Sequence, residues 1–252
     1  MISAYLRRIG FLPVKLVEAS FTTLCNLQRL HLESVPYENL DIMRGIPISL
    51  EIDNLFDKIV TRRRGGYCFE LNGLFAWLLR GLGFKVTEYL SRYLRDEEKI
   101  PMRRHRVLRV GVGGDCDYLC DVGVGGTIPR QPLAYKKNVV SQQNGESYLL
   151  KEEDFFGMVL YERQKDTWRR IYSFTEEEQA TIDYTMPSFY CEKHPNSLFR
   201  TMDMVHIFTR NGRKSIADRK FREYNHKGTK TIMPATERDY KELLFVHFGI
   251  KF

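Results

Sequence analysis

The stretch Arg62-Arg63-Arg64-Gly65-Gly66-Tyr67-Cys68-Phe69-Glu70-Leu71-Asn72 places a cysteine where a glycine turn becomes a helix. Free backbone N–H groups and the positive end of the helix dipole favour a thiolate there, and nearby arginines would favour it further. Such help matters because only roughly a few per cent of an ordinary cysteine is thiolate at neutral pH. The pattern indicates a nucleophile at Cys68, although a small cysteine that merely packs at a helix start fits it equally well.

Apolar residues spaced by three and four predict three helices in the first third of the chain. They span residues 20 or 22 to about 34, about 51 to 61, and 68 to 82, and Gly81 and Gly83 end the third. Each helix carries one apolar stripe, so the three stripes imply a small helical bundle.

After Phe84 the apolar pattern changes to a period of two, which is typical of strands. Residues 86–93, 105–112, 117–122, 147–151, 155–163 and 167–174 fit this pattern, which predicts an antiparallel sheet or barrel. The last 60 or so residues combine short strands at 204–209 and 214–218 with a terminal helix, for which Thr236 and Asp239 form a capping pair. The expected fold class is α+β.

Composition and charge exclude several classes of protein. With 43% hydrophobic and 28% charged residues, the chain is not disordered. The longest uncharged apolar run, residues 74–79, is far shorter than the roughly 20 residues that cross a bilayer. Arg7 and Arg8 interrupt the N-terminal segment before the apolar region of a secretory signal peptide could form, so we expect none. Five cysteines at irregular spacing fit a reducing compartment, so we expect a cytoplasmic protein without a membrane partner.

The positive charge is concentrated in one segment. The net charge is +7, and residues 191–230 hold ten Lys/Arg against four Asp/Glu, or +6. Such a segment attracts polyanions, for example nucleic acid, anionic lipid or a phosphorylated small molecule. A solvated surface that keeps the protein in solution explains the same charge.

A thiolate nucleophile needs a histidine, and the chain has six. Five of them lie in helical stripes or in the basic C-terminal part: His31, His194, His206, His226 and His247. His105 instead opens a predicted strand, and the carboxylate of Asp121 lies on the next one.

The length of the loop between these two strands decides whether His105 and Asp121 can meet. A three-residue loop, 112–114, pairs Gly111 with Asp115 and sets His105 directly opposite Asp121, with Cβ atoms roughly 5 Å apart. A five-residue loop makes them diagonal neighbours, and a two-residue loop puts them on opposite faces. Two of the three registers therefore let Asp121 orient the imidazole. Spacing alone does not bring Cys68 to the pair.

Other sites find less support. Cys116 and Cys120 have no second Cys/His pair at ligand spacing, so we expect no zinc or other metal. The glycines of residues 123–126 precede Thr127-Ile128-Pro129 rather than a helix, which argues against a dinucleotide site. No Gly-x-Ser-x-Gly motif is present for a serine hydrolase.

Four separated motifs and the chain's ending give the chain a resemblance to the arylamine N-acetyltransferases, of the bacterial type, over nearly its whole length. The segments that carry it are Val35-Pro36-Tyr37-Glu38-Asn39-Leu40-Asp41, Arg64 to Asn72, His105 with Leu108 and Val110, Asp121-Val122-Gly123-Val124-Gly125, and Phe248-Gly249-Ile250. The resemblance implies a helical bundle over residues 1–84, a central β-barrel over 85–190 and an α/β lid over 191–252. It also implies a cysteine-protease-like core in which Cys68, His105 and Asp121 meet.

The resemblance further implies a reaction. Acetyl-CoA, as co-substrate, would acetylate Cys68, and a small aromatic amine or hydrazine would take the acetyl group in a second step. The phosphates of CoA would give the basic segment a partner, with Lys214, Lys220 and Arg222 as candidates. We also expect an ion pair between Glu38 and Arg64 that fixes the turn before Cys68.

By the same resemblance, Val124, Gly126 and Ile128 would form the wall of the acceptor pocket. Some family members carry Phe at the position of Val124, so a roomier pocket is expected here. The chain stops soon after Gly249, so no long tail is expected over the site.

Two competing functions remain. A thiol hydrolase or transglutaminase-like enzyme would use the same three residues with water or a protein amine as acceptor, but papain-like signatures around Cys68 are absent. A nucleic-acid-binding protein would use the net charge, but no binding motif accompanies it, so we expect no nucleic acid. No obligate protein partner is evident.

Overall fold

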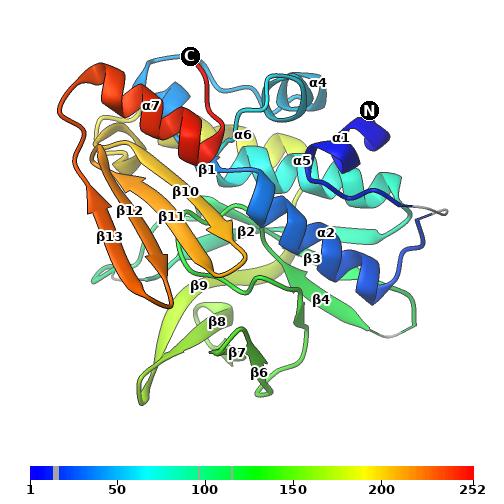
Figure 1. Cartoon of the computed structure of the whole chain (residues 1–252). Helices are drawn as coiled ribbons and strands as arrows, with labels where there is room; N and C mark the ends of the chain where they lie inside the picture. The colour runs from blue at the N-terminus through cyan, green and yellow to red at the C-terminus, as the bar shows by residue number, and fades with distance from the viewer. Residues whose placement is uncertain (14–16, 96, 115) are drawn as a thin grey trace.

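The computed structural model describes residues 1–13, 17–95, 97–114 and 116–252, and it is an α+β protein as expected. In Figure 1, the N-terminal helices lie above an eight-stranded sheet, and a second sheet with the last helix lies to the left, beside the helices. Within the described residues, no helix is both long and apolar enough to cross a membrane.

The N-terminal helices pack around a central one that begins at Cys68. The helices are α1 (Ile2–Arg8), α2 (Phe21–Ser34), α3 (Leu40–Met43), α4 (Ile52–Phe56) and α5 (Cys68–Gly81). In α5, Leu71, Leu74, Phe75 and Leu78 are fully buried, as the apolar stripe predicts. Burial of this face holds the start of α5 in a fixed place.

Of two predicted helices, one begins as expected and the other is divided into two parts. Ser20 begins α2, where its hydroxyl accepts a hydrogen bond from the Thr23 N–H at 3.3 Å. The helix expected over residues 51–61 is instead α4 followed by a π-helical turn, Asp57–Thr61. That turn directs the side chain of Lys58 into the protein, where it is buried.

The larger sheet is antiparallel throughout and curls into a nearly closed barrel. Its strands are β2 (Lys85–Tyr93), β3 (His105–Gly111), β4 (Asp117–Cys120), β5 (Leu133–Ala134), β6 (Val140–Gln143), β7 (Glu146–Glu153), β8 (Gly157–Gln164) and β9 (Thr167–Glu178). Their order is β5-β4-β3-β2-β9-β8-β7-β6. The strands β2 and β3 pack against α5, so the barrel meets the helices beside Cys68.

The smaller sheet joins distant parts of the chain. Its strands, in spatial order, are β1 (Tyr37–Glu38), β10 (Met204–Thr209), β11 (Gly212–Ala217), β12 (Lys220–Asn225) and β13 (Gly228–Ile232). The helix α7 (Glu237–Phe248) covers one face of it (Figure 1) and forms a second apolar core with residues such as Ile216 and Phe221. Through β1, this C-terminal sheet reaches the segment that precedes Cys68.

The sequence located most of the elements. All six predicted barrel strands exist, and the predicted cap of α7 is confirmed, because Thr236 Oγ1 accepts from the Asp239 N–H at 3.1 Å. The short strands β5, β6, β12 and β13 and the helix α6 (Thr185–Lys193) were not predicted. The expected boundary between the barrel and the lid, after residue 190, falls inside α6. The division into three domains therefore stays a prediction.

Candidate active site

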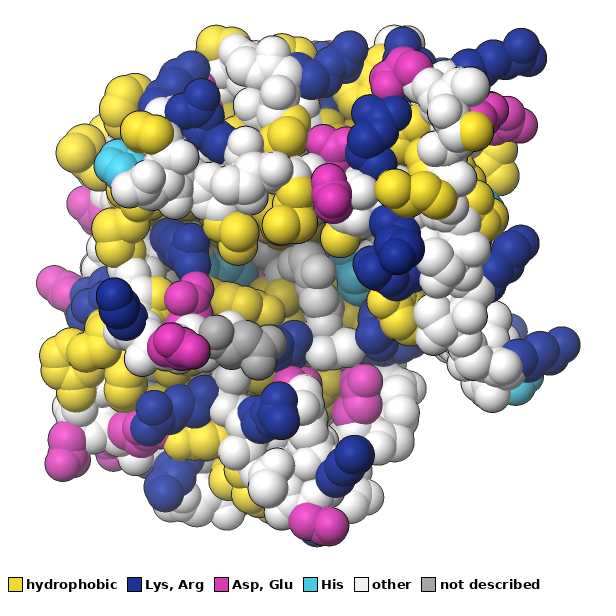
Figure 2. Space-filling view, turned by 90° about the vertical axis from the view of Figure 1, so that its left-hand side faces the viewer, with side chains coloured by type: hydrophobic (Ala, Val, Ile, Leu, Met, Phe, Trp, Pro, Cys, Tyr) yellow, Lys and Arg dark blue, Asp and Glu magenta, His cyan; other side chains and the backbone are white. Residues whose placement is uncertain are grey.

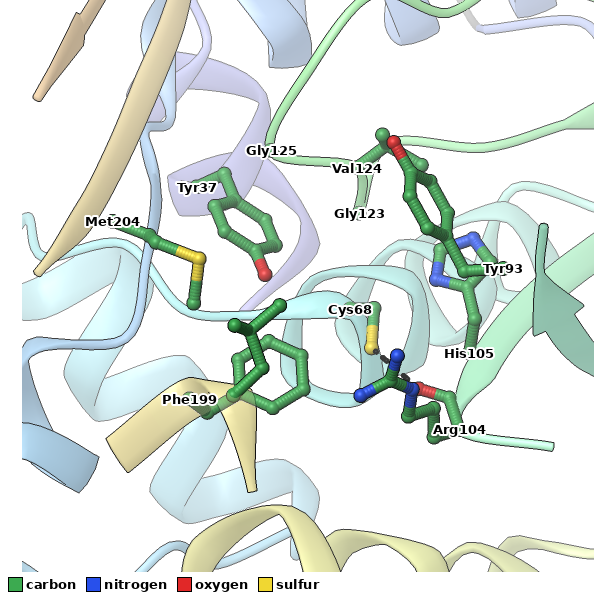
Figure 3. Close-up of a pocket in the computed structure, with 11 residues that line it drawn as sticks. Tyr37, Cys68, Tyr93, Arg104, His105, Gly123, Val124, Gly125, Phe199 and Met204 are labelled. Carbon is green, nitrogen blue, oxygen red and sulfur yellow. Dashed lines mark hydrogen bonds between the residues drawn. The ribbon is translucent and has the colours of Figure 1, made fainter. Parts of the chain in front are cut away.

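Cys68 is the first residue of α5 and lies at the bottom of a cavity. Its side chain is buried, and the thiol donates a long hydrogen bond to the carbonyl oxygen of Arg104 at 3.6 Å. Arg104 directly precedes His105 at the start of β3. Cys68 and His105 both line the cavity, so the fold brings together two residues that sequence spacing alone could not connect (Figure 3).

The thiol, rather than the thiolate, is the stable form of Cys68 in this environment. Burial raises the pKa of the Cys68 thiol well above its ordinary value, and the neighbouring Cys191 and Asp121 raise it further, against backbone N–H groups that lower it. Two of the three preceding arginines, which were expected to favour the thiolate, are paired with carboxylates. Arg64 is held by Glu38 and Asp41, and Arg62 pairs with Asp57 in an exposed position.

The strands β3 and β4 pair in the register of the five-residue loop. Gly111 pairs with Asp117 and Leu108 with Cys120, which makes His105 and Asp121 diagonal neighbours. The three-residue loop, in which Gly111 would pair with Asp115, is thereby excluded; Asp115 itself lies outside the described residues. Asp121 directly follows β4, and its Oδ2 lies 2.7 Å from His105 Nε2.

The carboxylate of Asp121 is enclosed by hydrogen-bond donors from three segments. Besides His105, its other oxygen, Oδ1, accepts from Asn72 Nδ2 and from the Gly123 N–H, both at 2.8 Å. Since a carboxylate only accepts, the proton on the imidazole is on Nε2. In the neutral ring, Nδ1 is then the acceptor left for another proton.

Asn72 ties the helix α5, which begins at Cys68, to the rest of the site. It stands one helical turn after Cys68, donates to the Arg106 carbonyl at 2.6 Å as well as to Asp121, and accepts from the Val122 N–H at 2.9 Å. Asn72 lies in the segment around Cys68 that indicated a nucleophile, but no role was predicted for it. Its spacing of four residues from Cys68 could have placed it at the site, because residues i and i+4 share one face of a helix.

A glycine allows the loop after Asp121 to pass close to the sulfur. A Cβ atom on Gly123 would lie 2.7 Å from the Cα of Cys68 and 2.7 Å from Asn72 Nδ2. Gly65, before the helix, is similarly restricted, since a Cβ there would lie 1.9 Å from the carbonyl oxygen of Pro36. Side chains at these two positions would displace the backbone that frames Cys68.

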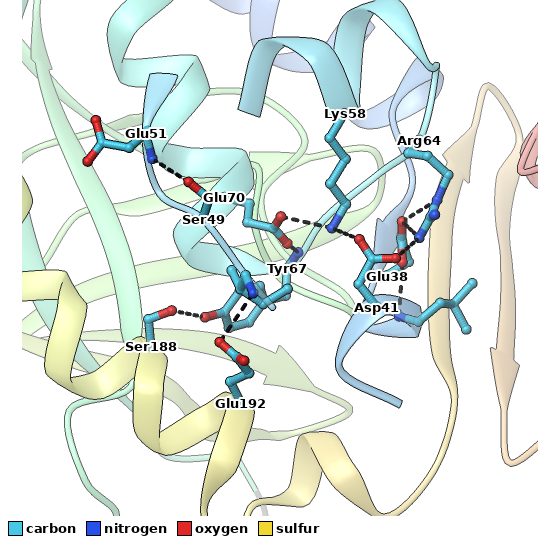
Figure 4. A network of polar contacts seen from close by, with 12 residues as sticks. Glu38, Asp41, Ser49, Glu51, Lys58, Arg64, Tyr67, Glu70, Ser188 and Glu192 are labelled. Carbon is cyan, nitrogen blue, oxygen red and sulfur yellow. Dashed lines mark hydrogen bonds and ion pairs between the residues drawn. The ribbon is translucent and has the colours of Figure 1, made fainter. Parts of the chain in front are cut away.

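A buried ion network fixes the segment that leads into α5 (Figure 4). The predicted ion pair is confirmed, with Arg64 Nη2 2.8 Å from Glu38 Oε1, and the same nitrogen lies 2.8 Å from Asp41 Oδ1. Lys58 Nζ then bridges Asp41 and Glu70, at 2.8 Å from each. These two cations and three carboxylates link α3, the π-helical turn, the glycine turn and the first turn of α5.

Two carboxylates of this network, Asp41 in its middle and Glu70 at one end, have pKa values that are shifted in opposite directions. Burial raises the pKa of Glu70, and Lys58 only partly offsets that effect. Burial also acts to raise the pKa of Asp41, but Lys58 and Arg64 outweigh it and the pKa lies below its ordinary value. Glu70 Oε2 in addition accepts the Tyr67 N–H at 3.1 Å, which caps α5 directly before Cys68.

The cavity at Cys68 is narrow and lined mainly by aromatic and apolar side chains. It holds about 140 Å³. Besides Cys68 and His105, its walls are formed by Tyr37, Tyr93, Arg104, Gly123, Val124, Gly125, Leu198, Phe199 and Met204. A space-filling view shows one face of the molecule hollowed near its middle, with histidine side chains inside and Lys and Arg side chains around it (Figure 2).

Of the three residues expected at the acceptor wall, Val124 lines this cavity. Gly126 and Ile128 are not among the described residues that line it; Ile128 is fully buried in the core. A Cβ on Gly126 would lie 3.3 Å from Arg95 Nη1 and 4.0 Å from a methyl carbon of Val124. The same Cβ would lie 3.8 Å from the hydroxyl of Tyr93, so Gly126 borders two residues of the cavity wall.

The three basic residues expected to bind CoA lie on two faces of the smaller sheet. Lys220 pairs with Ala217, whose other partner is the cavity residue Met204, so Lys220 shares the face of Met204. Arg222 points to the same side by strand alternation. Lys214 lies on the opposite face, where its Nζ is 3.3 Å from Nδ1 of His247 in α7.

Several cavity residues were not predicted from the sequence. Phe199 and Met204 come from a distant part of the chain, and Tyr37 enters through the pairing of β1 with β10. For Arg104 the sequence held one weak indication of a place at the site, because this residue directly precedes His105. Among the described residues, no group of three or more His, Cys, Asp or Glu side chains could hold a metal ion.

Comparisons with known proteins agree with this architecture. An N-acetyltransferase family model matches residues 20–252. A curated arylamine N-acetyltransferase from Mycobacterium tuberculosis is 35% identical over 256 residues, which cover 99% of this chain and 89% of that protein. The solved structure of arylamine N-acetyltransferase from M. tuberculosis matches with a TM-score of 0.92 at 33% identity, covering 100% of this chain and 94% of the other. The Mycobacterium marinum arylamine N-acetyltransferase, solved in complex with CoA, has a TM-score of 0.91 and 31% identity, covering 99% and 93%.

Removing the central cation of the ion network should destabilise the protein. Lys58→Met leaves Asp41 and Glu70 without their shared partner, and an unpaired buried charge costs roughly 3–5 kcal/mol of unfolding free energy. Urea unfolding followed by tryptophan fluorescence measures this. Lys137→Met is the control, because Lys137 pairs with Glu152 in an exposed position and its loss should not move the midpoint. Equal midpoints for the two variants would contradict the assigned role of Lys58.

Proposed function

The chain belongs to the arylamine N-acetyltransferase family, and from that premise we propose that it moves an acetyl group from acetyl-CoA to the nitrogen of arylamines or arylhydrazines. The route is a ping-pong reaction through an acetyl thioester on Cys68. The observation that carries the proposal is the placement of Cys68 in one cavity with His105, whose Nε2 is held by Asp121. The reported complex of the M. marinum relative with CoA supports the choice of donor.

In the first half-reaction, His105 acts as the general base. Because burial keeps Cys68 protonated at rest, proton transfer from Sγ to His105 Nδ1 accompanies the attack of sulfur on the acetyl carbonyl carbon. The new C–Sγ bond forms, the bond from the acetyl carbon to the CoA sulfur breaks, and the imidazolium returns its proton to the leaving CoA thiolate. Asp121 stays ionised and stabilises the imidazolium.

In the second half-reaction, the amine takes the acetyl group. Its nitrogen attacks the thioester carbonyl, His105 Nδ1 accepts a proton from that nitrogen, and the C–Sγ bond breaks. The proton then restores the Cys68 thiol. The aromatic walls supplied by Tyr37 and Phe199 suit an aryl acceptor, since ring faces and edges pack favourably against one another.

The same groups could in principle hydrolyse the thioester or acylate a protein amine. The narrow, largely apolar cavity favours a small aromatic acceptor over water or a polypeptide. We place the reaction in the cytoplasm, where a reducing environment keeps Cys68 as a free thiol.

Lys220 and Arg222 are the proposed contacts for the phosphates of CoA. They share the sheet face of the cavity residue Met204 and are partly exposed. Lys214, on the α7 face, would contribute only its charge at a distance.

The central test is intact-mass analysis after incubation with acetyl-CoA. We expect one added acetyl group that Cys68→Ala abolishes, with a burst of CoA release matching the enzyme concentration. His105→Gln should slow the acetylation by at least about a hundredfold, the lower range for a general base. The four other cysteines serve as internal controls, because none of them should carry the label in the digested protein. An unlabelled Cys68 would rule out the proposed reaction, and continuous CoA release without an amine would favour the hydrolase.

Charge reversal tests the proposed CoA contacts. Lys220→Glu or Arg222→Glu should raise the KM for acetyl-CoA by roughly fivefold, since an exposed ionic contact is worth up to about 1 kcal/mol, and the effect should shrink with added salt. Lys214→Glu makes the same charge change on the opposite face and should have a smaller effect. If the KM for acetyl-CoA in all three variants equals that of the wild type, the basic segment is a solvated surface and not a CoA site.

Enlarging the acceptor wall should narrow the range of amines. Val124→Phe is expected to lower kcat/KM for a naphthylamine about tenfold more than for aniline, because pocket contacts of this size discriminate by that order. Ile128→Val alters a nearby residue that does not line the cavity and should leave the ratio unchanged. A ratio that also stays constant in Val124→Phe would mean that the acceptor binds elsewhere.

A further inference from the structure

Arg104 is the one permanently charged side chain among the described residues that line the cavity. Its backbone is held on the C-terminal side, because its carbonyl oxygen accepts from the Cys68 thiol and the next residue begins β3. Figure 3 shows the guanidinium turned into the cavity, on the side where the sulfur of Cys68 lies. The chemistry proposed above gives this cation no role.

The guanidinium of Arg104 pairs with one carboxylate among the residues that the structure describes. In the described part of the chain, its carboxylate partner is Glu97, whose Oε1 lies 2.6 Å from Nη2, and the side chain of Glu97 is 34% exposed. Arg106, two residues further on, is different: its guanidinium is buried with Glu88 and also donates to the Phe69 carbonyl. Arg106 is therefore engaged in structure, whereas the guanidinium of Arg104 combines its described ion pair with a place in the cavity wall.

The surroundings make a cation at this place effective. The cavity walls are mostly aromatic and apolar, so water screens a charge there less than at the surface. The charge of Arg104 acts on groups around the cavity: burial raises the pKa of Tyr37, and Arg104 opposes that effect. Burial likewise raises the pKa of Cys191 to about 12, again against the influence of Arg104.

We propose that Arg104 is a specificity-determining residue that binds the carboxylate of an aminobenzoate-type acceptor, so that this enzyme prefers anionic arylamines to neutral ones. The inference rests on the proposed function, because it names a substrate class for the same site. The aryl ring would lie between the aromatic walls, with its amine toward the acetyl group on Cys68 and its carboxylate on the guanidinium.

The alternative source of an anion is CoA itself, and the position of Arg104 argues against it. The phosphates of CoA are separated from its sulfur by the long pantetheine arm. When that sulfur reacts with Cys68, the phosphates lie far from a side chain whose own backbone contacts the Cys68 thiol. A carboxylate on the acceptor ring needs to reach only across one aromatic ring. A fork-shaped guanidinium also matches a planar carboxylate with two parallel hydrogen bonds.

The test compares 4-aminobenzoate with its neutral amide, and 3-aminobenzoate with its amide, in the wild type and in Arg104→Gln. We expect the variant to lose about ten- to hundredfold in kcat/KM for the carboxylates, the range for a hydrogen bond to a charged group, and little for the amides. Because each acceptor is compared with itself across the proteins, the intrinsic reactivity of its amine cancels. Arg103→Gln is the matched control, since Arg103 faces Glu177 and does not line the cavity.

Two further variants keep the test decisive if Arg104→Gln folds poorly. Glu97→Gln removes the competing carboxylate and should lower the KM for the aminobenzoates without changing that for the amides. Arg104→Lys keeps the charge and should retain part of the preference. Equal losses for carboxylates and amides, or an unchanged KM in Glu97→Gln, would overturn the proposal.

The acetylation of Cys68 separates this proposal from the proposed function. Arg104→Gln should still accept one acetyl group from acetyl-CoA at the wild-type rate, measured by intact mass. A slower acetylation with unchanged acceptor selectivity would assign Arg104 to the donor and refute its role at the acceptor. An unacetylated wild type would refute the enzyme activity itself.

Discussion

The site depends on the set of hydrogen bonds around the carboxylate of Asp121. A buried carboxylate is costly unless donors surround it, and here Asn72, His105 and the Gly123 N–H supply them. These donors come from α5, β3 and the loop after β4, so one satisfied anion fixes three segments relative to one another. Since Asn72 stands one turn after Cys68, the same bonds set the position of the sulfur. The same hydrogen bonds therefore fix both the orientation of His105 and the position of Cys68.

The ion network before α5 serves the same geometry from the other side. Its five charged groups are buried, and such networks often contribute little net stability compared with apolar packing. Their effect is on geometry: Lys58 and Arg64 can satisfy Glu38, Asp41 and Glu70 only when the glycine turn follows its observed path. The pairing of β1 with β10 then extends this order to the C-terminal sheet, which supplies Met204 to the cavity.

Local patterns predicted what depends on neighbours in the chain. The start of α5, the strands β3 and β4 and the cap of α7 follow from periodicity and capping residues, and one of the three weighed loop registers is the observed one. The cavity walls were not predictable in this way, because Phe199 and Tyr37 meet only through long-range packing. The ion pair of Arg64 with Glu38 was predicted, but the second carboxylate partner of Arg64, Asp41, was not. Arg64 is therefore more fully paired with carboxylates than the sequence indicated.

Burial of the sulfur has two opposing consequences for the chemistry. It raises the pKa of Cys68, which disfavours a free thiolate at rest. In the proposed reaction, burial would also keep water from the acetyl thioester on Cys68, because the cavity is narrow and its walls are largely apolar. An oriented His105 reconciles the two, since a base beside the thiol removes the proton only as the new bond forms. A more exposed cysteine would ionise more readily but would expose an acetyl group to solvent, so under the proposed mechanism the buried thiol with a fixed imidazole would favour transfer over hydrolysis.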